Sequence, residues 1–277
     1  MTVPNVDLID GRAMPQLGFG VFQVPDDEAE QAVTTALENG YRSIDTAAVY
    51  RNERGTGRAL RASGVPREEL FVTTKLWNSD QGRDSALRAF DASLERLGLD
   101  YVDLYLIHWP MPRRGTYLET WRAFEELRRD GRARSIGVSN FTVETLRHIV
   151  DETDVVPAVN QIELHPYLQQ PGLRAFHAEH GIRTEAWAPL GQGQGLLDDP
   201  ALADIGRAHG RTPAQVALRW SLQLGNVVIP KSVTPSRIAE NIDVFGFELT
   251  ADEMKRIGEL EKGSRVGPDP AAFDAGA

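Results

Sequence analysis

Residues 82–109, GRDSALRAFDASLERLGLDYVDLYLIHW, join a helical pattern directly to a strand-like pattern. The run YVDLYLIHW, residues 101–109, is apolar and of strand length, and Gly98 precedes it where a helix C-terminus prefers glycine. The first part places four apolar residues at the spacing of one helix face: Leu87, Phe90, Leu94 and Leu97. This stretch predicts one helix–strand unit of an α/β fold.

Seven further strand-like runs alternate with helical patterns, at residues 17–22, 41–46, 70–77, 133–140, 158–164, 182–190 and 226–232. Strands alternating with helices, without a linker or a break in composition, favour a parallel sheet in a single domain. The count of eight favours a closed (β/α)₈ TIM barrel. The alternative, an open doubly wound sheet, normally carries G-x-G-x-x-G after its first strand, and GFGVFQV at residues 18–24 lacks the third glycine.

We therefore expect one barrel domain over residues 1–277. Two short alternating runs within residues 1–16 surround Asp10-Gly11, which predicts a hairpin with a two-residue turn. This hairpin would close the bottom of the barrel. Residues 263–277, GSRVGPDPAAFDAGA, are rich in Gly, Pro and Ala, and we expect them to form a loosely held tail.

The composition excludes several classes of protein. The chain has no cysteine, so disulfides, thiolate chemistry and cysteine-ligated metals are excluded. It has no signal-peptide pattern and no apolar run near the roughly 20 residues that span a bilayer, which predicts a soluble, cytoplasmic protein. A net charge of −10 argues against nucleic-acid binding. Nothing requires more than a monomer. The histidines of HAEH, residues 177–180, are predicted to lie on a solvated helix face rather than in a metal site.

Polar residues stand where the predicted strands end, and such barrels carry their chemistry at the C-terminal ends of strands. Taken alone, Asp45 could cap a helix, and His108 could be an ordinary core histidine. Lys75, inside the predicted strand 70–77, changes that reading because an isolated buried ammonium is too costly. Asp45 on the neighbouring strand can supply its counter-charge, so we expect these two residues to pair at one mouth of the barrel.

Tyr50 follows Asp45 in the next loop and could serve as a proton donor. A nearby ammonium favours the phenolate, so Lys75 is expected to lower the pKa of Tyr50 toward the range of a general acid. A neutral His108 could donate a hydrogen bond to a carbonyl oxygen. These groups suit a carbonyl that gains negative charge and a proton. No serine lies in a G-x-S-x-G turn, so a nicotinamide hydride is the expected attacking group.

The second half of the chain carries residues suited to a dinucleotide. Ser139, Asn140 and Gln161 could bind a carboxamide, Trp187 offers a flat face, and the loop PLGQGQG, residues 189–195, could approach a pyrophosphate. PKSVTPSRIAEN, residues 230–241, places three residues at the opening of a predicted helix where a 2′-phosphate could bind: Lys231, Ser232 and Arg237. The alternative is an ordinary charged helix start.

These motifs resemble the aldo-keto reductases over residues 5–260. GYRSIDTAAVYRNE, TTKLW, VDLYLIHWP, SIGVSNF, VNQIELHPY and IPKSVTPSRIAEN stand in the order of that family. PAVNQIELHPY and GVFQVP make the chain most similar to the bacterial 2,5-diketo-D-gluconate reductases. The resemblance implies an NADPH-dependent carbonyl reductase on a (β/α)₈ barrel, acting on aldehydes and ketones, with a keto-sugar acid such as 2,5-diketo-D-gluconate as a plausible substrate.

The resemblance also implies individual roles. Tyr50 would be the acid, Lys75 would tune it, Asp45 would pair with Lys75, and His108 would orient the carbonyl. The cofactor would contact Ser139, Asn140, Gln161, Trp187, Leu190, Gln192, Gly193, Lys231, Ser232, Val233, Arg237, Glu240 and Asn241. The substrate pocket would be lined by Phe22, Val49, Trp77, His108 and Trp109.

Two other functions remain open at this point. One is an NADPH-binding sensor or regulatory barrel with little turnover, against which the complete set of four catalytic-type residues argues. The other is a barrel hydrolase or isomerase that uses Asp45, Glu163 and His108, which would leave the cluster at residues 230–241 unexplained.

Overall fold

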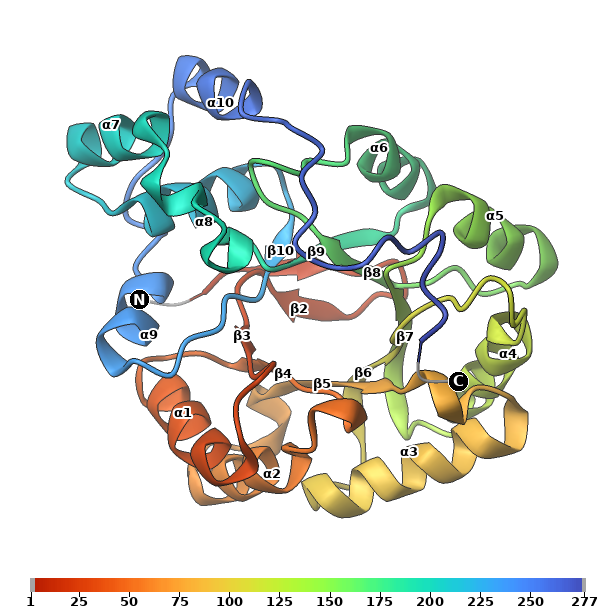
Figure 1. Ribbon diagram of the computed structural model, residues 1–277. Helices are drawn as coiled ribbons and strands as arrows, with labels where there is room; N and C mark the ends of the chain where they lie inside the picture. The colour runs from red at the N-terminus through yellow and green to blue at the C-terminus, as the bar shows by residue number, and fades with distance from the viewer. Residues whose placement is uncertain (1–2, 276–277) are drawn as a thin grey trace.

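The computed structural model of this protein describes residues 3–275, which form a single parallel β-barrel surrounded by helices (Figure 1). The sheet order is β10-β9-β8-β7-β6-β5-β4-β3, with every neighbouring pair parallel. Its strands are β3 (Phe19–Gly20), β4 (Ser43–Asp45), β5 (Phe71–Leu76), β6 (Val102–Ile107), β7 (Ala133–Ser139), β8 (Val159–Glu163), β9 (Arg183–Trp187) and β10 (Val227–Val228). The predicted eight strands and TIM-barrel class are confirmed.

The first and last strands of the sheet close the barrel. The Gly18 amide donates to the Val228 carbonyl at 2.9 Å, and the Val228 amide donates to the Gln16 carbonyl at 3.1 Å. Leu17 and Val228 form a parallel bridge. Strands β3 and β10 are only two residues long, so this closure depends on a few backbone bonds beyond the regular strands.

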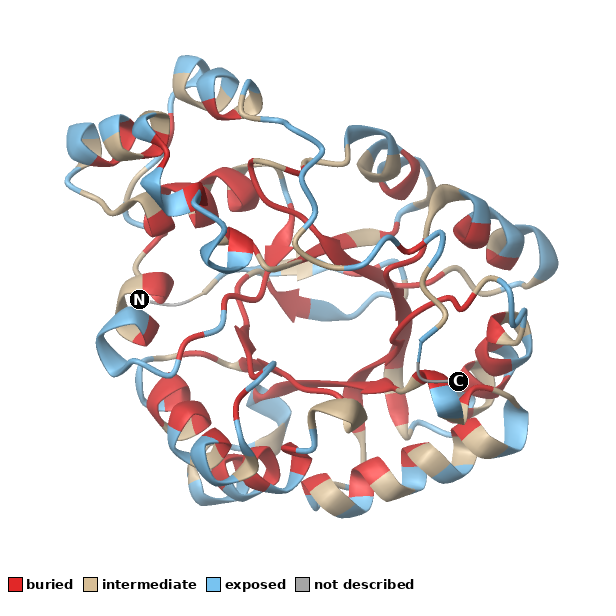
Figure 2. Cartoon of the chain, viewed as in Figure 1, coloured by how far each residue is buried: buried red, intermediate tan, exposed pale blue. Residues whose placement is uncertain are grey.

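The helices form the outer layer of the barrel. They are α1 (Asp26–Glu38), α2 (Glu53–Ala62), α3 (Arg83–Leu97), α4 (Tyr117–Arg129), α5 (Val143–Glu152), α6 (Pro171–His180), α7 (Pro200–His209), α8 (Pro213–Gln223), α9 (Pro235–Ile242) and α10 (Ala251–Gly258). Short 3₁₀ turns are η1 (Ala48–Tyr50), η2 (Arg67–Glu69), η3 (Asn78–Asp80), η4 (Gly191–Gly193) and η5 (Leu196–Asp198). Figure 2 shows a ring of buried strands, with the buried side of each large helix turned toward it. Within residues 3–275, no helix has both the length and the apolar character to cross a membrane.

The N-terminal hairpin lies across the far end of the barrel from the viewer in Figure 1. Its strands β1 (Asn5–Asp7) and β2 (Ala13–Pro15) pair antiparallel. Met14 is fully buried in a cluster with barrel residues that include Leu104, Leu106 and Val227, so the hairpin closes this end with apolar side chains. The predicted two-residue turn is wrong: residues 8–12 separate the strands, and Leu8 bonds to both Arg12 and Gly11.

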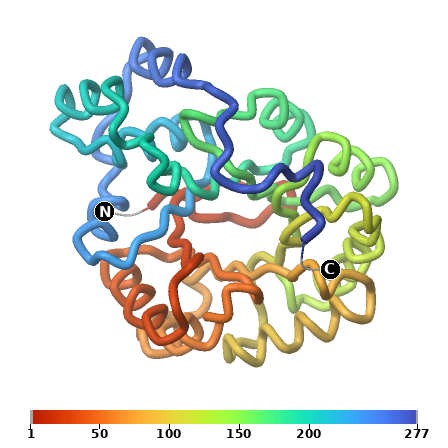
Figure 3. The backbone as a smooth tube through the Cα atoms, in the orientation of Figure 1, coloured from red at the N-terminus to blue at the C-terminus, as the bar shows by residue number. Residues whose placement is uncertain are grey.

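The C-terminal segment crosses the opposite end of the barrel (Figure 3). The amides of Val266 and Gly267 donate to the two carboxylate oxygens of Glu163, at 2.6 and 3.0 Å. Further along, the side chain of Asn78 donates to the carbonyl of Ala275 at 2.8 Å. The prediction of a loosely held tail is therefore wrong for residues 263–275, because backbone hydrogen bonds rather than regular secondary structure hold this segment. Residues 276–277 lie outside the described part.

His177 also departs from its prediction. The sequence places it on a solvated face of α6, whereas the structure buries it. Its ring accepts or donates hydrogen bonds at 2.9 Å to Asn160 and 2.8 Å to Thr184. Burial, with a smaller contribution from Arg174, lowers its pKa to about 3. A neutral His177 therefore joins α6 to β8 and β9.

Two helical glycines provide a matched test of this packing. A Cβ on Gly57 of α2 would lie 2.1 Å from the carbonyl oxygen of Leu97 at the end of α3, whereas a Cβ on Gly172 of α6 would meet nothing within 4 Å. We expect Gly57→Ala to lower the free energy of unfolding by about 1–3 kcal/mol through overpacking. Gly172→Ala should cause no decrease, because alanine favours the helix. Urea unfolding of both variants measures this, and equal stabilities would contradict the close α2–α3 contact.

Candidate active site

Lys75 and Asp45 form a buried ion pair at the mouth end of the barrel. The Lys75 ammonium lies 2.5 Å from Asp45 Oδ1, and neither side chain is more than 4% exposed. Lys75 also donates to the carbonyl of Thr46 at 3.0 Å. Burial alone lowers the pKa of Lys75, but Asp45, followed by Tyr50, outweighs it and raises the pKa above 10.5. Lys75 therefore stays cationic, as the sequence predicts.

Tyr50 adjoins this pair on the 3₁₀ turn η1. Its hydroxyl lies 3.4 Å from the Lys75 ammonium, and the ammonium lies 5.0 Å from the centre of its ring. Arg51, directly after it, has a φ of 59°, in the left-handed region. This conformation turns the chain into α2 and leaves Tyr50 at the barrel mouth, so the structure brings together the residues predicted to act in proton transfer.

The predicted pKa of Tyr50 is wrong in direction. Burial raises the pKa of Tyr50 above 10 and outweighs the opposing effect of Lys75. The charge of Asp45 also raises it. The physical reason is burial: Lys75 lowers the pKa of Tyr50 as predicted, but its ammonium is 3.4 Å from the phenol, and its effect is smaller than that of desolvation. Tyr50 is therefore a protonated phenol at neutral pH.

His108 follows β6 and completes the predicted group of four. Its ring lies 5.6 Å from that of Tyr50 and 5.3 Å from that of Trp77, each edge to face. Burial, and then the positive charge of Lys75, lower the pKa of His108 well below 6.5. The imidazole is therefore neutral and can donate a hydrogen bond to an oxygen without carrying charge.

Aromatic side chains lie beside Tyr50 and His108. Phe22 lies 5.1 Å from Tyr50 between ring centres, and Trp109 lies 4.4 Å from Phe273. The predicted pocket residues Val49 and Trp77 are half-buried on the adjoining η1 turn and the end of β5. Phe273 was missed by the sequence prediction because it belongs to the segment expected to be loose. The structure places it beside the predicted pocket.

Gln161 on β8 connects the ion pair to a residue that the sequence did not indicate. Its side-chain nitrogen donates at 2.8 Å to Asp45 Oδ2 and at 2.8 Å to Glu185 Oε2. Glu185 lies on β9 and is fully buried. The signal in the sequence was a lone acid inside the strand-like run IRTEAWAPL, on the same face of the strand as Trp187.

Asn140 fixes the next part of the mouth. Its side-chain nitrogen donates to the His108 carbonyl at 3.0 Å and to Ser139 Oγ at 3.1 Å, while its oxygen accepts the Trp187 indole N–H at 2.8 Å. Ser139 in turn donates to the Gln161 carbonyl at 2.9 Å. The residues predicted to surround a nicotinamide therefore contact one another. The side-chain nitrogen and oxygen of Asn140 both form hydrogen bonds to protein groups.

The glycine-rich loop after β9 has an unusual backbone. Ala188, Gln192 and Gly193 all have positive φ, at 49°, 45° and 75°, and η4 spans Gly191–Gly193. Gln192 and Gly193 are exposed, and Leu190 is partly buried. Such a sequence of turns exposes backbone N–H groups, as the prediction of a pyrophosphate loop requires.

Exposed cations gather at the start of α9. Lys231 and Arg237 are exposed and form no ion pair within residues 3–275. Ser232 accepts the Thr234 amide at 3.1 Å just before the helix. The other predicted residues share this helix or its approach: Val233 is 47% exposed, Glu240 accepts a hydrogen bond from Thr212 at 2.8 Å, and Asn241 is buried.

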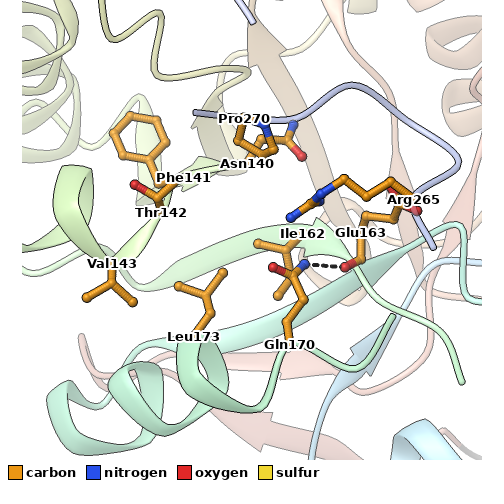
Figure 4. Close-up of a pocket in the computed structure, with 10 residues that line it drawn as sticks. All are labelled: Asn140, Phe141, Thr142, Val143, Ile162, Glu163, Gln170, Leu173, Arg265 and Pro270. Carbon is orange, nitrogen blue, oxygen red and sulfur yellow. Dashed lines mark hydrogen bonds between the residues drawn. The ribbon is translucent and has the colours of Figure 1, made fainter. Parts of the chain in front are cut away.

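A cavity of about 140 Å³ lies between β7, β8 and the C-terminal segment (Figure 4). Asn140 and Glu163 line it from the barrel, and Arg265 and Pro270 line it from the segment. Gln170 closes one side, where it donates to the Glu163 carbonyl at 2.5 Å. The cavity thus adjoins the predicted nicotinamide residues and is partly formed by the segment that crosses the mouth.

Comparison with known proteins accords with this geometry. The model of the Aldo/keto reductase family matches residues 16–262. An aldo-keto reductase of Mycolicibacterium smegmatis is 59% identical over 271 residues, which cover 98% of each chain. Methylglyoxal reductase DkgA of Escherichia coli (strain K12) is 53% identical over 269 residues, which cover 97% of each chain.

Solved structures of similar proteins have the same fold. Gox0644 in its apoform superposes with a TM-score of 0.94 at 52% identity, over 98% of each chain. A Gox0644 mutant in complex with NADPH gives the same TM-score and identity over 99% of each chain. The chain belongs to the aldo/keto reductase family.

Proposed function

We propose that this protein reduces aldehydes and ketones to alcohols with NADPH, with Tyr50 as the proton donor. One observation carries the proposal: the buried Lys75–Asp45 pair lies beside a protonated Tyr50 and a neutral His108. A carbonyl oxygen between the phenol and the imidazole would meet two neutral hydrogen-bond donors. The hydrogen bonds from both donors become stronger as negative charge develops on that oxygen.

The residues present fit NADPH. Lys231 and Arg237 at the start of α9 are exposed, have no ion-pair partner in the described part of the chain, and suit a 2′-phosphate. The positive-φ loop at residues 188–195 suits a pyrophosphate. Gln161 Oε1 receives no hydrogen bond from residues 3–275 and can accept one from a carboxamide. Relatives in this family have been solved with NADPH or NADP, namely a Gox0644 mutant and the Bombyx mori enzyme AKR2E4.

Each protein group then has a task. Bound NADPH would supply the hydride to the carbonyl carbon. His108 orients the carbonyl by donating a hydrogen bond to its oxygen, and Tyr50 transfers its phenolic proton to the same oxygen. Lys75 stabilises the phenolate that this transfer leaves, because its ammonium is 3.4 Å away. Asp45 keeps Lys75 charged and in place.

Aromatic side chains would flank the carbonyl substrate in the proposed pocket. Phe22, Trp77, Trp109 and Phe273 supply aromatic walls, and the DkgA relatives are named methylglyoxal reductases. Methylglyoxal is therefore the first substrate to test, with 2,5-diketo-D-gluconate as the keto-sugar acid suggested by the resemblance. The protein would act as a cytoplasmic monomer.

Neither alternative accounts for the site as well. A hydrolase or isomerase based on Glu163 is disfavoured, because both of its carboxylate oxygens accept amides of the C-terminal segment and His165 lies 3.0 Å from one of them. An NADPH sensor without turnover would not need a protonated Tyr50 beside a buried ammonium. The NADPH sensor differs from the proposed reductase in one measurable property, which is turnover.

Tyr50→Phe tests the proton donor. It removes only the phenolic oxygen, so we expect kcat for methylglyoxal reduction to fall by about 10²–10⁴-fold. The Kd for NADPH should change little. Oxidation of NADPH at 340 nm and fluorescence titration measure the two quantities. Unchanged kcat in the variant would exclude Tyr50 as the acid, and absence of turnover in the wild type would favour the sensor.

Arg237→Ala tests the phosphate site. Loss of a charge-assisted hydrogen bond of about 1.5–3 kcal/mol should weaken NADPH binding by roughly 10–100-fold. The affinity for NADH, which has no 2′-phosphate, should stay near its wild-type value. Arg129→Ala, at an exposed position of α4, is the matched control. An equal loss of affinity for both nucleotides in Arg237→Ala would contradict the assignment.

A further inference from the structure

Glu185 has no role in the mechanism above, although it is a fully buried acid in the centre of the barrel. One of its oxygens accepts the Gln161 amide at 2.8 Å. The other, Oε1, has no hydrogen-bond partner within residues 3–275. An ionised carboxylate in this setting would be costly, because nothing compensates the charge on the second oxygen.

The Gln161 side chain is fixed by two acids at once. A primary amide has two N–H groups, and those of Gln161 are directed to Asp45 and to Glu185 at equal distances of 2.8 Å. Both donors are therefore used inside the barrel. The amide oxygen must point away from the two acids, and it is the only part of this side chain left to bind a ligand.

We propose that Glu185 is a positioning residue: its carboxyl group holds the Gln161 amide against Asp45, so that Gln161 Oε1 is presented to the cofactor's carboxamide. Glu185 thereby connects the cofactor-binding residue on β8 to the ion pair on β4 and β5. It acts through Gln161 and contacts neither the substrate nor the cofactor.

The protonation of Glu185 matters for this role. Burial, with the charge of Asp45 in addition, raises the pKa of Glu185 from 4.5 to about 8. Glu185 is then mostly a neutral acid at pH 7 and becomes an anion as the pH rises past 8. The anion raises the pKa of Tyr50 further. A phenol with a higher pKa is a weaker proton donor, so turnover should fall over this range.

The neighbours of Glu185 leave few other groups that titrate there. The charged groups facing it are Asp45 on β4 and Lys75 on β5, and Gln161 on β8 is neutral. On its other side, β10 contributes only Val227 and Val228. Lys75 and Tyr50 have pKa values raised above 10, and that of His108 lies well below 6.5. Glu185 is therefore the group of this cluster that changes charge near pH 8.

The proposal rests on the proposed reductase function. Glu185→Gln keeps a hydrogen-bond acceptor but not the acid, whereas Glu185→Leu removes both. The two variants therefore separate the positioning of Gln161 from the change of charge at Glu185. In Glu185→Gln the new amide oxygen can still accept the Gln161 N–H, so the Kd for NADPH should stay within about threefold of wild type. Glu185→Leu lacks any acceptor, and we expect its Kd for NADPH to rise about tenfold. Fluorescence titration with NADPH measures both without requiring turnover.

The pH profile gives the second readout. Wild-type kcat for methylglyoxal reduction should fall as the pH rises through about 8, whereas Glu185→Gln should show no fall there. Asp103→Asn is the control. Asp103 is a largely buried acid near the start of β6, at the end of the strand away from His108, and it pairs with Arg67 at 2.7 Å. The Asp103→Asn variant should keep the wild-type pH profile. Thermal unfolding identifies any variant that fails to fold.

The outcomes distinguish the two proposals. A wild type that reduces no carbonyl compound rejects the reductase function, while the NADPH titrations still test the positioning of Gln161. An active wild type whose pH profile and NADPH affinity are the same in both Glu185 variants overturns the role of Glu185 and leaves the reductase intact. A profile that moves equally in Asp103→Asn would also overturn it, because the effect would then belong to any buried acid.

Discussion

The pairing of Lys75 with Asp45 is the constraint on which the rest of the site depends. A buried ammonium with no exposed surface must have a counter-charge, and removing one partner of such a pair typically costs about 3–5 kcal/mol. The barrel meets this requirement by placing the two residues on the adjacent strands β4 and β5. Tyr50 then contacts Lys75, and Gln161 contacts Asp45. One ion pair thus contacts both the residue that we propose as proton donor and the residue that we propose binds the cofactor.

The barrel mouth combines rigid and irregular parts. The strands fix the positions of Asp45, Lys75, Gln161 and Glu185, all of which are buried. Outside the strands lie the exposed Lys231, the exposed Arg237 in the first turn of α9, and the positive-φ turns after β9. The C-terminal segment forms hydrogen bonds to Glu163, and its Phe273 packs against Trp109. The buried ion pair and the residues hydrogen-bonded to Asp45 therefore lie on strands, whereas Tyr50 and most of the other residues proposed to contact ligands lie on turns, on α9 or on the segment that crosses the mouth.

Much of the fold and part of the candidate site could be predicted from the sequence, because hydrophobic periodicity is a local property of the chain. The eight strands, the barrel and the Lys75–Asp45 pair were predictable from alternating patterns and from the cost of a buried charge. The direction of the Tyr50 pKa shift was not, because it depends on how deeply the folded chain buries the phenol, which outweighs the effect of Lys75. Glu185 was missed since a single acid in a strand does not show what lies opposite it. The held C-terminal segment and the buried His177 were missed because both depend on distant partners.

The need for the Lys75–Asp45 ion pair can be measured by removing both charges together, so that no unpaired charge stays buried. In the double variant Asp45→Asn with Lys75→Met, the site stays neutral, so the protein should fold and bind NADPH. A single-turnover measurement of NADPH oxidation with saturating methylglyoxal then reports the chemical step. We expect a rate at least about 100-fold below wild type, in line with the usual contribution of general acid catalysis. A single-turnover rate close to wild type, in a folded variant that binds NADPH, would contradict it.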